Sequence, residues 1–100
     1  MPQQNDLGEM TQRLRDNLPS LAARYRVRSL GVFGSYVRHE ERPDSDLDVL
    51  IEFDETPSLF EFIQLEHELS GLLGVRIDLV MRDALKPDIG KHILREVVPV

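Results

Sequence analysis

The chain has no cysteine and no tryptophan, and only 6% of its residues are aromatic. Without cysteine it can form no disulfide, no thiolate metal site and no cysteine nucleophile, which is compatible with the cytoplasm. No apolar run approaches the ~20 residues that a membrane-spanning helix needs. The polar start, MPQQNDLGEM, contains no apolar signal region. We therefore expect a cytoplasmic protein that does not associate with membranes.

Basic residues are also scarce. Twelve Lys and Arg stand against 18 Asp and Glu, which gives a formal net charge of -6. Proteins that bind nucleic acid backbones need a basic surface, so direct binding of nucleic acid is not expected. With 41% hydrophobic and 30% charged residues the composition is that of a globular protein. A length of 100 residues fits a single domain over 1–100, in which 1–8 form a loose start.

The spacing of apolar residues predicts alternating helices and strands. The expected segments are helix 9–26, strand 27–33, a helical turn at 35–39, strand 46–53, helix 59–73, strand 75–81 and helix 88–98. Pro19 is expected to break or kink the first helix, with Asn17 as the cap of a second short helix. Ser58 and Glu61 have the spacing of a capping box. The apolar residues between Leu59 and Leu73 are expected to face the core.

The lengths of the connections predict how the strands pair. Strands 46–53 and 75–81 are joined by a helix, which favours a parallel pair. Strands 27–33 and 46–53 are joined by a loop, which favours an antiparallel pair. The sequence thus predicts an α/β (α+β) fold with a small mixed sheet of three to four strands and helices packed on one face.

Two aspartates open a strand that should be buried. Alternation places Asp46 and Asp48 on the same face, roughly 6–7 Å apart at their Cα atoms. Asp78 lies between apolar residues in the strand expected to be its neighbour. Carboxylates are the ligands that magnesium prefers, and three of them can hold two ions about 3.5–4 Å apart. We therefore expect Asp46, Asp48 and Asp78 to bind magnesium, with two ions in the site.

A Gly-Ser pair precedes this strand. Gly34 removes side-chain bulk where a backbone approaches a ligand, and Ser35 adds a hydroxyl at the start of a helical turn whose N–H groups suit a phosphate. Arg38 follows one turn later and could reach the same anion. The pattern indicates a phosphate site beside the predicted metal site.

Simpler interpretations exist for each feature taken alone. The Gly-Ser pair can be only a turn, Arg38 can pair with Glu40 or Glu41, and Ser45 can cap or orient the acidic strand. A calcium loop is a rival for the acids at residues 44, 46, 48, 52 and 55. That loop would need glycine where this chain has Val49.

The combined pattern resembles a known family. The chain has GS, nine further residues and then SDLD, followed by VRIDLV. This is similar to the signature of the DNA polymerase beta-like nucleotidyltransferases, and most of all to their minimal nucleotidyltransferase branch. That branch pairs with HEPN-domain toxins in toxin–antitoxin operons. One position departs from it, because the family often has Ala-Arg-Gly after the Gly-Ser-x and this chain has His39 in place of that glycine.

The resemblance assigns roles to the residues. It implies that Gly34 and Ser35 hold the triphosphate of ATP, with Arg38 and Ser45 as further candidates for nucleotide binding. Asp46, Asp48 and Asp78 would be the catalytic and magnesium-binding acids, and Asp78 also the base.

The expected function is that of an antitoxin. It would transfer AMP from ATP to a hydroxyl of a partner HEPN toxin, with tyrosine as the expected acceptor, and the partner could also make it oligomeric. The alternatives are an antitoxin that neutralises by binding alone and an adenylyltransferase of small molecules.

Overall fold

The computed structural model describes residues 7–100. Its elements are α1 (Leu7–Tyr25), β1 (Val27–Phe33), β2 (Leu47–Phe53), α2 (Leu59–Leu73), β3 (Ile77–Met81), the 3-10 turn η1 (Arg82–Ala84), α3 (Pro87–Glu96) and β4 (Val98–Pro99). Of the loose start predicted for 1–8, residues 1–6 lie outside the described residues. Leu7 and Gly8 already belong to α1, so the prediction was wrong for these two residues.

The four strands form one mixed sheet in the order β3-β2-β1-β4. β1 and β2 are antiparallel and β2 and β3 are parallel, which confirms both predicted pairings. The sequence did not predict β4. Its residues pair with the second half of β1, where Val98 lies opposite Val32, so the last helix ends before them rather than at 98.

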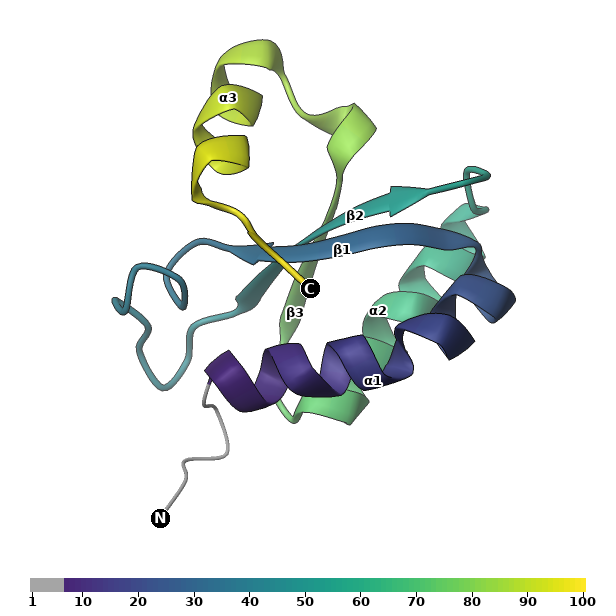
Figure 1. The fold of residues 1–100 in the computed structure, drawn as a ribbon, viewed down its shortest axis with the longest axis horizontal. Helices are drawn as coiled ribbons and strands as arrows, with labels where there is room; N and C mark the ends of the chain where they lie inside the picture. The colour runs from purple at the N-terminus through teal and green to yellow at the C-terminus, as the bar shows by residue number, and fades with distance from the viewer. Residues whose placement is uncertain (1–6) are drawn as a thin grey trace.

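Figure 1 shows α1 and α2 together on one side of the sheet and α3 on the other. The two sides follow from the alternation of β2. Leu47, Val49 and Ile51 are buried in the core that α1 and α2 cover. Asp48 projects to the opposite side, where residues of α3 line a cleft with it. The predicted mixed fold is confirmed, but the prediction that the helices pack on one face was wrong for α3, which lies on the other side of the sheet from α1 and α2.

The first helix is continuous through Pro19, so the predicted break and the cap at Asn17 were wrong. Asn17 instead donates from Nδ2 to the carbonyl of Arg13 at 2.8 Å, inside the helix. Leu14 and Leu21 are buried on either side of the proline, and this packing outweighs the one lost backbone hydrogen bond. Pro19 itself is exposed, where an unpaired carbonyl can be hydrated.

The second helix begins and ends as predicted. Ser58 and Glu61 form the capping box, and Gly74 ends the helix in the left-handed conformation with φ of 71°. The prediction for its apolar residues was only partly right. Leu69 and Leu73 are buried and Phe62 packs against the core, but Leu59 is 75% exposed and Ile63 46% exposed, so these two residues lie on the solvent-facing side of α2.

No helix in the part of the chain from residue 7 onward has the length and apolarity to cross a membrane.

Candidate active site

The turn after β1 is built for a close approach of its backbone to β2. Gly34 has φ of +83°, and a Cβ added to it would overlap the carboxylate of Asp48. The N–H groups of Val37 and Arg38 both donate to the carbonyl of Gly34 at 3.1 Å, which closes the turn. Tyr36, only 1% exposed, anchors the turn in the core. Sequence analysis predicted the turn at Gly34 but not the buried tyrosine.

Two of the predicted acids lie side by side. β2 and β3 are paired so that Asp48 is in register with Asp78. Burial first, and then the neighbouring Asp78 charge, raise the pKa of Asp48 from 3.8 to about 6. Among residues 7–100, neither carboxylate forms an ion pair with an Arg or Lys. Negative charge is therefore concentrated here, and the nearby Arg38 offsets only part of its effect on the pKa of Asp48.

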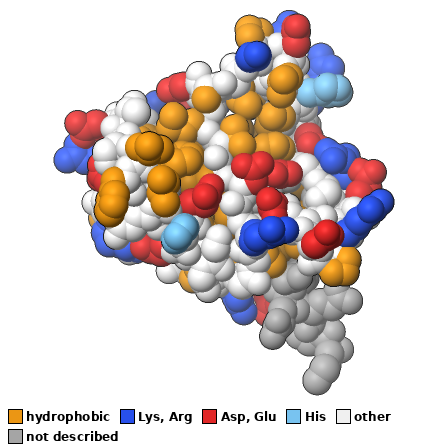
Figure 2. All heavy atoms as spheres, turned by 180° about the vertical axis from the view of Figure 1, so that it is seen from behind, with side chains coloured by type: hydrophobic (Ala, Val, Ile, Leu, Met, Phe, Trp, Pro, Cys, Tyr) orange, Lys and Arg blue, Asp and Glu red, His pale blue; other side chains and the backbone are white. Residues whose placement is uncertain are grey.

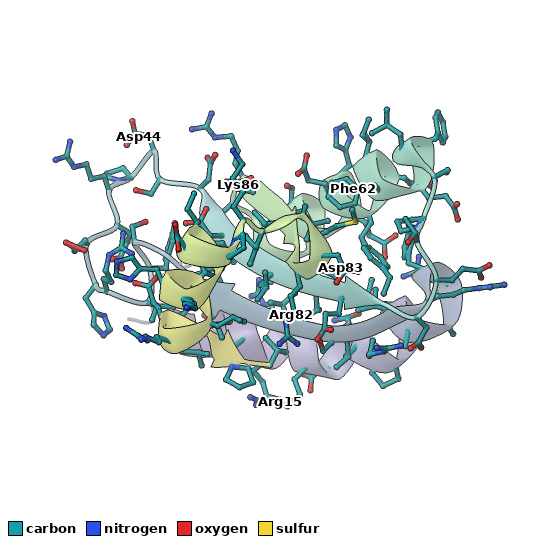
Figure 3. All side chains as sticks on the ribbon, turned by 90° about the horizontal axis from the view of Figure 1, so that it is seen from above. Arg15, Asp44, Phe62, Arg82, Asp83 and Lys86 are labelled. Carbon is teal, nitrogen blue, oxygen red and sulfur yellow. The ribbon has the colours of Figure 1, made fainter. Side chains whose placement is uncertain are left out.

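A second acid on the same face of β2 shows the contrast. Glu52 accepts a hydrogen bond from Ser29 at 2.9 Å and forms an ion pair with Arg82 at 3.1 Å. These contacts, the Ser29 hydrogen bond first, lower the pKa of Glu52. In Figure 3, which looks onto the side of the sheet where α3 lies, Arg82 is labelled over the strands. Glu52 is thus neutralised within the protein, whereas Asp48, four residues earlier, is not.

The third predicted acid has a partner of its own. Asp46 immediately precedes β2, and its carboxylate lies 3.1 Å from the guanidinium of Arg76. Within the described residues, no group of three or more His, Asp or Glu side chains is arranged as a metal site. The structure therefore brings Asp48 and Asp78 together and shows Asp46 in an ion pair beside them.

The chemistry of these residues fits magnesium. This ion usually takes one or two carboxylates together with water and substrate phosphates, so Asp48 and Asp78 would suffice as its protein ligands. A cation there would offset the burial and the like charge that act on Asp48. Figure 2 shows acidic side chains gathered near the middle of the rear face, with basic side chains beside them.

The other candidates form contacts within the protein. Arg38 donates from Nε to Glu40 and from Nη1 to Glu96, each at 2.6 Å. Glu96 also accepts a hydrogen bond from the backbone N–H of Gly34 at 3.0 Å. The hydroxyl of Ser45 accepts from the N–H of Arg42 at 2.8 Å, which supports its role as a cap of the loop.

A cleft of about 560 Å³ joins these features. Gly34, Arg38 and Asp48 line one side, and residues of α3 line the other; the α3 residues are His92, Ile93, Arg95 and Glu96. Sequence analysis did not select any residue of α3. No local sequence signal links Glu96 to the Gly-Ser motif, because the two are 62 residues apart in the chain.

His39 explains why a glycine is common at this position of the motif. Its φ is 59°, a conformation that costs a non-glycine residue ~1–2 kcal/mol. We expect His39→Gly to stabilise the fold by about 0.5–1 kcal/mol, because relief of this strain exceeds the extra entropy of glycine in the unfolded chain. Urea unfolding measures the effect. His39→Ala is the control, since it removes the side chain and keeps the strain, and an equal gain in both variants would contradict the explanation.

Comparison with known proteins identifies the class. The family model described as Nucleotidyltransferase domain matches residues 12–100, which include the Gly34 turn and all three acids. The chain therefore belongs to the nucleotidyltransferase domain family. Within it, the chain is 52% identical over 94 residues to the protein adenylyltransferase MntA of Thermococcus cleftensis, and the match covers 94% of this chain and 95% of that protein. The enzyme class predicted from the sequence is thus confirmed.

Solved structures agree with this assignment. The structure of a "putative minimal nucleotidyltransferase" is similar with a TM-score of 0.76 and 41% identity, over 92% of this chain and 94% of that one. A chain from the complex of a tri-AMPylated Shewanella oneidensis HEPN toxin with its MNT antitoxin has a TM-score of 0.59 and 20% identity, over 92% of this chain and 66% of that one. The second likeness concerns the fold alone.

Proposed function

We propose that this protein transfers AMP from ATP to a hydroxyl group of a HEPN-type toxin, depends on magnesium and acts as the antitoxin of the pair. The observation that carries the proposal is the contact between the Gly34 turn and Asp48, next to Asp78. It combines a backbone without side-chain bulk with two carboxylates that lack an ion-pair partner among residues 7–100. Phosphates bound by a divalent cation fit this combination.

The candidate residues would have three roles in the transfer: binding the triphosphate, binding magnesium and accepting the proton. The turn at Gly34 and Ser35, with Arg38, would hold the triphosphate, since backbone N–H groups and guanidinium are strong phosphate donors. Asp46, Asp48 and Asp78 would hold magnesium, which when bound neutralises charge that develops on the phosphate oxygens. The acceptor oxygen bonds to the α-phosphorus, the bond from that phosphorus to the bridging oxygen breaks, and pyrophosphate leaves. The proton of the hydroxyl passes to Asp78.

A protein acceptor is supported by the relatives and by the surface. The relative from T. cleftensis is named a protein adenylyltransferase, and a neighbour with the same fold is found in complex with an AMPylated HEPN toxin. Large apolar side chains are exposed on α2 and on α3, and of these two helices α3 borders the cleft; the exposed residues are Leu59, Phe60, Ile63, Ile89 and Leu94. Exposed apolar surface is typical of protein interfaces.

The test is an intact-mass measurement. The protein is mixed with the HEPN-type protein of its own genome, ATP and magnesium, and the partner is then weighed. We expect a gain of one or more AMP units on the partner, located on tyrosine by fragmentation, and no gain with the Asp48→Asn variant. An unchanged partner mass, together with full neutralisation in a stable complex, would instead establish an antitoxin that acts by binding alone.

A further inference from the structure

Glu96 lies at the position where the proposed function places a nucleotide phosphate. It is the last residue of α3, and its carboxylate spans two groups of the Gly34 turn. Oε2 accepts a hydrogen bond from the N–H of Gly34 at 3.0 Å, and Oε1 lies 2.6 Å from Nη1 of Arg38. Two parts of the chain that are 62 residues apart are thus joined through one anion.

These two donors are of the kinds that bind phosphate oxygens. A backbone N–H at a glycine turn and a guanidinium both form strong hydrogen bonds with anions. The carboxylate of Glu96 is held in its charged form, because the hydrogen bond from Arg38 and that from Gly34 lower its pKa. Its side chain is only 22% exposed, so it fills part of the cleft rather than extending into solvent.

We propose that Glu96 takes the place of a nucleotide phosphate at Gly34 and Arg38 while the site is empty, and so competes with ATP for these donors. The inference rests on the proposed function, since it assumes that a triphosphate binds at Gly34 and Arg38. A triphosphate and the Glu96 carboxylate cannot use the same donors at once. Binding of ATP therefore requires that Glu96 leave, which frees the end of α3 from the turn.

Displacement of Glu96 lowers the apparent affinity for ATP. Only the fraction of molecules in which the carboxylate has left can bind, and the observed dissociation constant rises accordingly. Arg38 is not lost in this exchange, because its Nε keeps the contact with Glu40 at 2.6 Å. Glu40 does not contact Gly34 in the structure, so it provides a matched control for Glu96.

The test compares ligand affinities of the full chain by calorimetry at a constant magnesium concentration. Glu96→Gln keeps the shape of the side chain and removes its charge. We expect it to bind ATP and inorganic tripolyphosphate about three- to tenfold more tightly than the unmodified protein. Glu96→Ala should show the same gain, and Glu96→Asp should return toward the original affinity. Glu40→Gln should change the affinity by less than twofold, or about the error of the method.

The outcomes separate this inference from the proposed function. If the unmodified protein binds ATP and modifies its partner but Glu96→Gln gains no affinity, or loses it, the inference fails alone and Glu96 supports Arg38 instead. If neither protein binds ATP or tripolyphosphate, both the proposed function and the inference fail. If Glu96→Gln gained affinity for ATP but not for tripolyphosphate, the inference would also be overturned, because Glu96 is proposed to compete with the phosphate groups that both ligands share.

Discussion

Asp48→Asn is expected to lower the rate of AMP transfer about 10²–10³-fold while the fold stays intact. Asparagine has the size of aspartate but not its charge, so a cation loses its main ligand on β2. Asp48 is only half-buried and adjoins Asp78, and the variant removes a repulsion rather than a stabilising contact. Most substitutions within a strand destabilise, whereas this one should not.

The same residue predicts how stability depends on pH in buffer without metal. The pKa of Asp48 is raised from 3.8 in the unfolded chain to about 6 in the fold. Between these values the folded protein binds more protons than the unfolded one, so the contribution of Asp48 to stability falls as pH rises from about 4 to about 6. With allowance for solvent screening we expect a loss of about 1–2 kcal/mol.

The measurements are partner modification by mass and urea unfolding at pH 4 and pH 7. The Asp48→Asn variant should transfer AMP about 10²–10³-fold more slowly, be equal or superior in stability at pH 7, and be less stabilised by added magnesium than the unmodified protein. Glu52→Gln is the control, because Glu52 shares the face of β2 but is neutralised by Ser29 and Arg82. It should keep its activity and lose stability. Full activity of Asp48→Asn at the same magnesium concentration would exclude Asp48 as a ligand.

Local rules were enough to predict the sheet and the acidic edge of the site. Alternation in β2 separated Asp48 from Val49 and its apolar neighbours, and the helical connection made β2 and β3 parallel. These two facts together place Asp78 beside Asp48 before any coordinates are known. Gly34 was predictable for the same reason, since a turn next to that strand needs a residue without a side chain.

Features that depend on tertiary packing were not predictable. Pro19 is a strong local signal, but the core on both sides of it keeps α1 continuous. Periodicity in α2 predicted burial at Leu59, although Leu59 is exposed together with Phe60 and Ile63, while Phe62 and Leu65 face the core. The role of Glu96 could not be predicted, because its contacts with Gly34 and Arg38 form only when α3 packs against the turn.

Gly34→Val is expected to reduce both nucleotide binding and transfer, the latter about 10²-fold or more. The backbone at Gly34 has φ of +83°, which a β-branched residue adopts only under strain. A Cβ at this position would overlap the Asp48 carboxylate, so either the turn or the acid must move. Displacement of a site residue by ~1 Å can by itself cost 10²-fold in rate. The variant thus disturbs the phosphate site and the metal site together.

Calorimetric titration with ATP and unfolding in urea measure the two consequences of this change. Two controls separate them from a general effect of added bulk. Gly71→Ala adds a methyl group on α2 that would contact no other part of the described chain, and it should keep full ATP affinity and stabilise the helix by about 0.5–1 kcal/mol. Ser35→Ala removes one hydroxyl and leaves the backbone donors, so its loss should be smaller than that of Gly34→Val. Equal ATP affinity in Gly34→Val and the unmodified protein would show that phosphate does not bind at this turn, since no side chain can enter that space without displacing Asp48.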